Sequence, residues 1–174
     1  MSFDQEQVRG IMTSVSHEPD RSSAILALAA IDVALEELLK AFLIENTPES
    51  IFKGNSPLAT LSARIDMSFS MGLISPNEKR DLHLMRKVRN KFAHEIDHEL
   101  KFEDDPIRNW IQELETPKPI ISTQMFSGGK DTNRNRFDLT FAVLFSSIRH
   151  TRKLSIQRVV SPENSYIKVK NEDR

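Results

Sequence analysis

The sequence contains no cysteine in its 174 residues, so disulfides, thiolate metal ligands and cysteine nucleophiles are excluded. It also lacks an apolar run of the roughly 20 residues that a membrane-spanning helix needs. The longest apolar-rich stretch, 24–43, is interrupted by charged residues from Asp32 to Lys40. The first four residues have neither the basic nor the apolar segment of a secretory signal. We therefore expect a cytoplasmic protein without membrane contact.

An excess of charge of one sign is also missing, because the formal net charge is −1. The molecule as a whole therefore offers no electrostatic attraction to nucleic acid. The charges are unevenly placed, since acidic residues outnumber basic ones in 1–60 and basic residues outnumber acidic ones in 130–174. The two regions could pair within one molecule or between the subunits of a homodimer, although solvated faces of unequal charge are the preferred interpretation.

Glycine and proline are sparse, with 5 and 8 residues, and they stand mostly where helices would begin or end. The apolar fraction of 39% and the charged fraction of 28% are those of a globular domain. We predict an all-α protein, a compact bundle of five to six helices in a single domain over 1–155. Residues 156–174 are expected to form a C-terminal tail that is partly ordered at best.

The longest predicted helix begins with Asp20 as its N-cap and runs to about residue 44. Leu28, Ile31, Leu35 and Leu38 recur in it at spacings of three and four, so this helix should lie at the centre of the core. The other predicted helices are 4–14, a helix that starts at Ser56-Pro57 and stops at Gly72, a helix with a capping box at Ser75 to Glu78, a short helix capped by Asp104 or Asp105 before Pro106, and 136–154. Residues 116–135 are predicted to be one long loop.

A polar constellation lies near the end of the helix that starts at Ser75. Arg86, Asn90 and His94 are spaced by four residues and share a helix face, and Arg89 adjoins Asn90. The pattern Arg-Asn-x-x-x-His over 89–94 resembles the motif of HEPN domains, helical proteins of which many cleave RNA as dimers. That resemblance implies that Arg89 would position a phosphate and His94 would assist attack by the 2′-hydroxyl.

A structural role for the same residues is the preferred interpretation. A basic side chain beside Val88 and Phe92 is expected at the margin of the core, where it needs a counter-charge. Asp32 is the acid in the most apolar part of the central helix, so it is the expected partner of Arg89 or Arg64. The candidate polar or binding cluster therefore comprises Asp32, Arg64, Arg86, Arg89, Asn90 and His94.

The string His94-Glu95-Ile96-Asp97-His98 matches the H-E-x-x-H pattern of zinc peptidases. That chemistry needs both histidines on one continuous helix and a third ligand from elsewhere. Helical periodicity ends near His94, and the only later histidine is His150. The sequence therefore predicts no metal and no cofactor.

A DNA-reading helix-turn-helix is not recognisable either. The nearest turn, at 72–76, follows a long helix and is capped by proline, unlike the usual arrangement in which a glycine turn joins the two helices. The last helix ends in basic residues, Arg149 to Lys153, which the negative end of a helix dipole accounts for. Direct sequence-specific DNA binding is therefore not expected.

Three blocks taken together point to a family. They are 24–42 (AILALAAIDVALEELLKAF), 52–74 (FKGNSPLATLSARIDMSFSMGLI) and 81–94 (DLHLMRKVRNKFAH), closed by 102–107. In order and spacing they resemble the mannitol operon repressor (MtlR) family. The resemblance implies a compact helical protein that lowers expression of a hexitol uptake and oxidation operon, without a DNA-binding domain.

Two functions from different classes follow from these observations. The favoured one is a transcriptional repressor of a mannitol operon, which is not an enzyme and acts through a protein partner or an RNA. The alternative is a metal-independent endoribonuclease of the HEPN type that uses Arg89, Asn90 and His94.

Overall fold

The computed structural model describes residues 5–43, 47–96, 99–121 and 131–156. Within these ranges the chain forms α-helices and a 3-10 helix, η1, and it has no strand. The helices are α1 (Gln5–His17), α2 (Asp20–Phe42), η1 (Glu49–Phe52), α3 (Leu61–Ser70), α4 (Pro76–His94), α5 (Ile107–Gln112), α6 (Lys118–Ile121) and α7 (Asn133–Ile156). The predicted all-α class is confirmed, and the count of α-helices in the described ranges slightly exceeds the predicted five to six because of the short helix α6.

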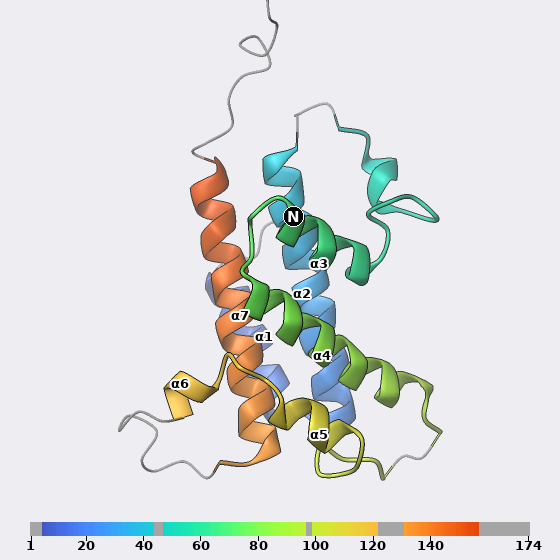
Figure 1. Cartoon of the computed structure of the whole chain (residues 1–174), viewed down its shortest axis with the longest axis vertical. Helices are drawn as coiled ribbons and strands as arrows, with labels where there is room; N and C mark the ends of the chain where they lie inside the picture. The colour runs from blue at the N-terminus through green and yellow to red at the C-terminus, as the bar shows by residue number, and fades with distance from the viewer. Residues whose placement is uncertain (1–4, 44–46, 97–98, 122–130, 157–174) are drawn as a thin grey trace, which may run out of the picture.

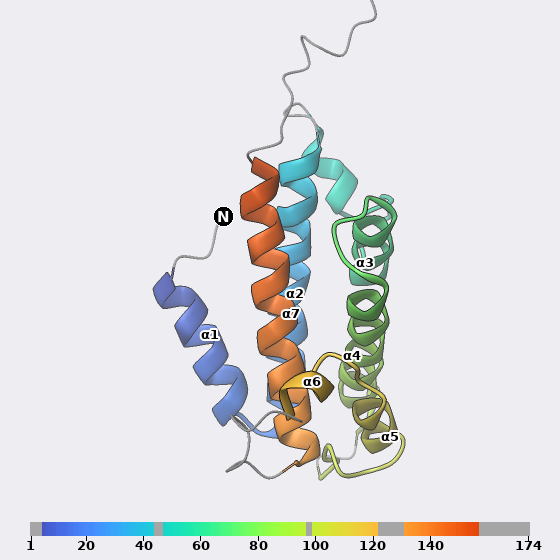
Figure 2. The same ribbon diagram turned by 60° about the vertical axis from the view of Figure 1, so that its left-hand side comes forward.

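The helices form three layers (Figures 1 and 2). α2 and α7 lie side by side in the middle and run in the same direction. Arg134 of α7 pairs with Asp20 near the starts of both helices, at 3.1 Å, and Arg152 lies 3.8 Å from Glu37 near their ends. α1 packs against one side of this pair, and α3, α4 and α5 cover the other side.

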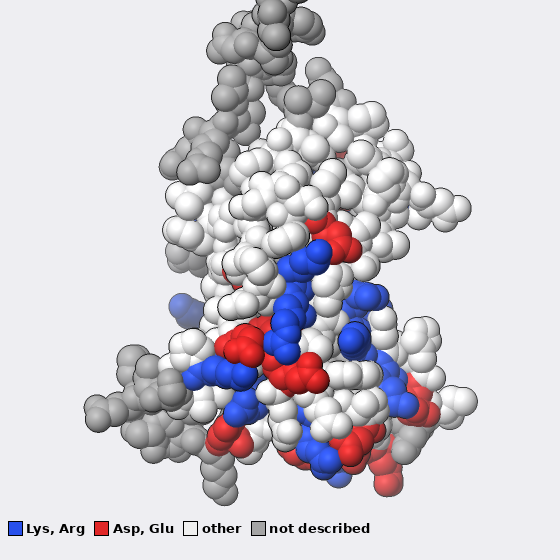
Figure 3. Space-filling view, in the orientation of Figure 1, with Lys and Arg blue, Asp and Glu red and all other residues white. Residues whose placement is uncertain are grey.

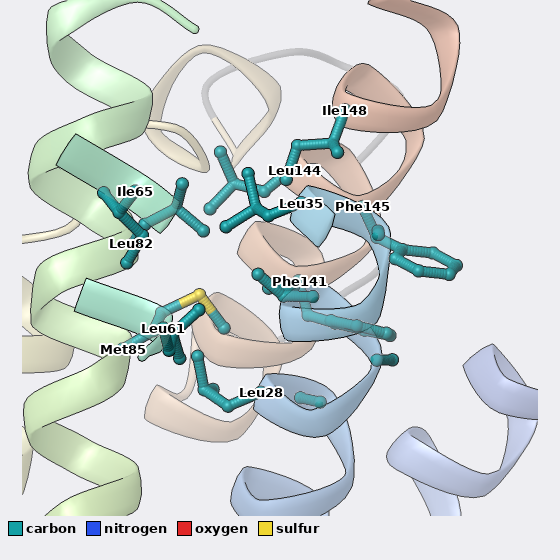
Figure 4. Packing of buried hydrophobic residues seen from close by; sticks show 14 of the residues in the cluster. Leu28, Leu35, Leu61, Ile65, Leu82, Met85, Phe141, Leu144, Phe145 and Ile148 are labelled. Atoms are coloured by element: carbon teal, nitrogen blue, oxygen red, sulfur yellow. The ribbon is translucent and has the colours of Figure 1, made fainter. Parts of the chain in front are cut away.

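α2 is the central helix, as predicted. Leu28, Ile31, Leu35 and Leu38 are at most 1% exposed, which confirms the apolar face read from their spacing. Figure 4 shows how the neighbouring helices close over this face. The contributing side chains include Leu61 and Ile65 of α3, Leu82 and Met85 of α4, and Phe141, Leu144 and Ile148 of α7.

The start of α4 and the end of α3 are as predicted. The Ser75 side chain accepts a hydrogen bond from the Glu78 backbone N–H, and the Glu78 carboxylate accepts one from the Ser75 N–H at 2.7 Å, which forms the capping box. α3 ends at Ser70, and Gly72 follows with φ of 70°. A positive φ suits glycine, so the turn between the two helices depends on its missing side chain.

The predicted start of α3 at Ser56-Pro57 is wrong. Residues 56–60 form turns, and the helix begins at Leu61 with Thr60 as N-cap, whose hydroxyl accepts from the Ala63 N–H at 3.2 Å. The Leu58 N–H instead bonds back to the Ile51 carbonyl at 3.0 Å. This bond holds 51–58 as a closed loop, so the proline belongs to the loop rather than to the helix.

Other boundaries also differ from the prediction. Asp20 is the first residue of α2 rather than its N-cap, which is Pro19. Pro106 is the N-cap of α5, which has no side-chain cap, so neither Asp104 nor Asp105 caps that helix. The region 116–135 is not one loop, because it contains α6 and the start of α7 at Asn133. Its remaining part, 122–130, and most of the predicted tail, 157–174, lie outside the described residues.

Arg134 joins three elements at one end of the bundle. Its guanidinium donates to the carbonyls of Val15 and Glu18 at 2.5 and 2.8 Å and pairs with Asp20 and Asp138. A cation at the C-terminal end of α1 also complements its dipole. Burial raises the pKa of the Asp138 carboxyl, although its bond to Arg134 acts in the opposite direction.

Candidate functional site

Arg64 of α3 lies at the centre of a polar cluster, and its own side chain is buried, only 7% exposed. Its two terminal nitrogens each lie 2.7 Å from a carboxylate of α2, Nη1 from Asp32 and Nη2 from Glu36. The two acids are four residues apart, so α2 presents both on one face. Arg64 is thus a fork that holds two carboxylates, an arrangement that lysine could not reproduce.

The same guanidinium also satisfies backbone carbonyls of the loop before α3. Nε donates to the Leu58 carbonyl at 2.9 Å, and Nη2 donates to the Phe52 carbonyl at 3.1 Å. The Phe52 ring centroid lies 5.9 Å from the guanidinium carbon. Arg64 therefore joins α2, α3 and the 51–58 loop.

Lys40 extends the cluster towards the surface. It pairs with Glu36 at 2.8 Å and with Glu49 of η1 at 2.9 Å. Burial opposes the charge on Lys40, but the hydrogen bonds to Glu36 and Glu49 outweigh it and raise the Lys40 pKa. Each of the three carboxylates of this cluster, Asp32, Glu36 and Glu49, is thus paired with at least one of its two cations, Arg64 and Lys40.

The other candidate residues all lie on α4 and apart from this cluster. Arg86, Arg89 and Asn90 are partly buried, and His94 is exposed at the last position of the helix. Their side chains form no hydrogen bond or ion pair with any residue that the structure describes. Of the two arginines considered as partners for Asp32, Arg64 is the one that pairs with it.

The ribonuclease alternative needs Arg89 and His94 to act on one phosphate. His94 is exposed, as that function would require. The two residues are five positions apart on α4, however, and an α-helix turns by about 140° over five residues. The two side chains therefore project in different directions, and one chain does not bring them together.

The zinc pattern over 94–98 does not lie on one helix. α4 ends at His94, and Glu95 already has extended backbone angles, φ −86° and ψ 131°. The C-terminal end of α4 is held by Arg21 of α2, which donates to the Phe92 and Glu95 carbonyls at 2.6 and 3.0 Å. His98 lies outside the described residues. Among the residues that are described, no group of three histidine, aspartate or glutamate side chains is placed to hold a metal ion.

An open apolar groove between α1 and α2 was not predicted from the sequence. It has a volume of about 590 Å³ and is lined in part by Gly10, Ile11, Leu26, Ala29 and Val33. Leu26 and Val33 remain 41% and 43% exposed. No other described residue covers these two side chains. The periodicity of α2 could not predict which apolar residues stay exposed, because apolar residues lie on more than one face of the helix.

None of the described helices combines the length and the apolar content required to cross a membrane. These observations define the class of the protein, which is an all-α bundle. Its Arg64 cluster joins helices to one another. In the described part of one chain, the candidate residues on α4 do not come together as a catalytic site. The mannitol repressor (MtlR) family model matches residues 21–162, and the chain belongs to this family. The family resemblance read from the sequence is thereby confirmed.

Comparison with solved structures supports the same fold. The chain is similar to a chain in the X-ray structure of the MtlR–HPr complex from Escherichia coli, with a TM-score of 0.63 and 21% identity. The match covers 83% of this chain and 99% of that chain, so almost the whole of the E. coli chain has a counterpart here. No curated protein matches the sequence.

Proposed function

We propose that this protein is a negative regulator of a mannitol (hexitol) utilisation operon that works in the cytoplasm through contacts with another protein. The observation that carries the proposal is the family match over 21–162. It extends across the central helix from its second residue, the polar cluster around Arg64 and the whole of α7. We therefore assign the regulatory role to the helical bundle itself and not to a separate domain.

HPr is the partner that we propose. The E. coli protein with the similar fold was solved as a complex with HPr. Since the fold alignment covers 99% of that chain, this bundle has the elements from which an equivalent interface could be built. Regulation would then follow the availability of the partner, and the bundle itself would need no catalytic residue.

Direct operator binding is not part of the proposal. The net charge of −1 gives no general attraction to the phosphate backbone. The turn between α3 and α4 is a poor helix-turn-helix candidate, because it ends in a proline-started, capped helix. The usual arrangement has a glycine turn that joins the two helices.

Deletion of the gene should raise the mannitol operon transcript several-fold in cells grown without mannitol, and the wild-type gene should restore repression. Purified protein should give no operator-specific mobility shift at nanomolar concentration and physiological salt, where specific DNA binders normally do. Quantitative PCR and a shift assay with a scrambled duplex as control measure the two results. An unchanged transcript would overturn the regulatory role, and a specific nanomolar shift would overturn the mode of action.

A further inference from the structure

The outward face of α2 carries a stripe of exposed apolar residues. Ile25, Leu26 and Val33 are 41–43% exposed, and the exposed Ala29 lies between them. Elsewhere in the described residues, exposed large apolar side chains lie singly on different elements. The surface over α4 and α5 is different, because charged side chains of both signs gather there (Figure 3). A contiguous apolar surface of this kind is typical of a face that another protein surface covers.

The stripe borders the groove between α1 and α2, where α1 is inclined away from α2 (Figure 2). Among the residues that line this groove, Glu18 is the only charged one. Gly10 lines it from the interior of α1, where glycine costs roughly 1 kcal/mol relative to alanine. Its φ is not positive, and a Cβ atom added there would meet no atom within 4 Å. No described part of the chain therefore requires glycine here, whereas close approach of a helix from another molecule would.

The spacing of the stripe favours a second copy of this chain as the molecule that covers it. Ile25 and Val33 each lie four residues from Ala29, on opposite sides. When two α2 helices pack antiparallel with Ala29 opposite Ala29, Ile25 of each copy meets Val33 of the other. A twofold axis requires such reciprocal contacts. Ser22 and Glu36, seven residues from Ala29, also face each other, so no like charges meet.

The size of this face indicates a weak dimer. α1 has 13 residues and at 1.5 Å per residue spans about 20 Å. Two adjacent helices, each about 10 Å across, make the face about 20 Å wide. Such a face is smaller than the standard interface, which buries ~800 Å² on each partner. We therefore expect association at micromolar concentrations and not a permanent dimer.

We propose that the groove between α1 and α2 is the interface of a weak homodimer, in which two α2 helices pack antiparallel across a twofold axis at Ala29. The small side chain of Ala29 allows the two helices to approach closely. α1 of each copy flanks α2 of the other, and the missing side chain of Gly10 leaves room for it. This interface goes beyond the proposed function, because it involves neither HPr nor the operon.

Sedimentation velocity of the full chain, from low micromolar to submillimolar concentration, tests the association. Wild-type protein should shift from monomer to dimer over this range. Ala29→Glu places two like charges at the axis and should raise the dimer dissociation constant at least about tenfold. Ser146→Glu is the matched control, since it adds the same charge at an exposed position of α7 that does not line the groove. It should associate as the wild type does, and circular dichroism should show both variants folded.

Disulfide trapping tests the register, and the chain has no cysteine of its own. Ala29→Cys should form a disulfide-linked dimer under mild oxidation, because its two copies meet at the axis. Two copies of Ile25→Cys would lie about 12 Å apart along the helices, beyond the reach of a disulfide. Ile25→Cys and Val33→Cys should therefore cross-link poorly alone and readily when the two proteins are mixed. Ser146→Cys should not cross-link.

Three results would overturn the proposal. One is a protein that stays monomeric at every concentration, and another is a dimer that Ala29→Glu and Ser146→Glu weaken equally, which would reflect charge alone. The third is a dimer in which Ala29→Cys fails to cross-link, because the interface would then lie elsewhere. A monomer that loses HPr binding in Ala29→Glu would make the groove a partner site and would also exclude the homodimer.

Discussion

Replacement of Arg64 by alanine is expected to lower the free energy of unfolding by about 3 kcal/mol, because two buried carbonyls lose their donor. Asp32 and Glu36 keep side-chain exposures of 36% and 27%, so water can compensate much of their loss. The carbonyls of Leu58 and Phe52 lie behind the guanidinium and would lose their donor. Each unsatisfied buried acceptor costs about 1–3 kcal/mol, so the carbonyls account for most of the effect.

Urea denaturation followed by circular dichroism measures this change. Arg108→Ala is the control, because its pair with Asp105 is exposed on both sides and should contribute less than about 1 kcal/mol. In a double-mutant cycle, Arg64→Ala and Asp32→Ala should be clearly non-additive, since the two side chains are in direct contact. A loss below about 1 kcal/mol for Arg64→Ala would mean that the cluster does not join α2 to α3.

The second large effect is expected for Leu35→Ala, which should destabilise the protein by about 2–5 kcal/mol. Leu35 is fully buried in the middle of α2, between helices that contribute Leu82 and Leu144 (Figure 4). The helices on both sides are held by many other contacts and cannot close over the missing atoms. The substitution therefore removes buried apolar surface and also creates a cavity, and both lower the free energy of unfolding.

Ile25→Ala is the matched control for this prediction. Ile25 lies on the same helix but is 42% exposed, and alanine has the higher helix propensity. Its replacement should change the free energy of unfolding by less than about 1 kcal/mol, as judged from thermal or urea denaturation. If both variants lose equal stability, α2 is not the centre of the core.

The sequence predicted the helices best where periodicity and capping agreed. α2 and α4 were located because Leu28, Leu35 and the capping box at Ser75 are local signals. The start of α3 was misplaced, because Pro57 is a valid helix-start signal and only the bond from Leu58 to Ile51 shows that it belongs to a loop. Such contacts depend on the tertiary structure.

The candidate site was harder to predict for the same reason. Asp32 could be recognised as an acid that needs a partner, but the choice between Arg64 and Arg89 depends on how α3 and α4 pack. Glu36 was not assigned to the cluster, although its four-residue spacing from Asp32 was a usable signal. The exposed apolar stripe of α2 could not be distinguished from its buried face without the position of α1.

Isothermal titration calorimetry of the purified protein with HPr from the same organism tests the central claim most directly. The account predicts saturable binding of stoichiometric amounts of HPr, without nucleic acid or metal in the buffer. Absence of binding with both proteins at about 100 µM, which would leave less than about 4 kcal/mol of binding free energy, would contradict it.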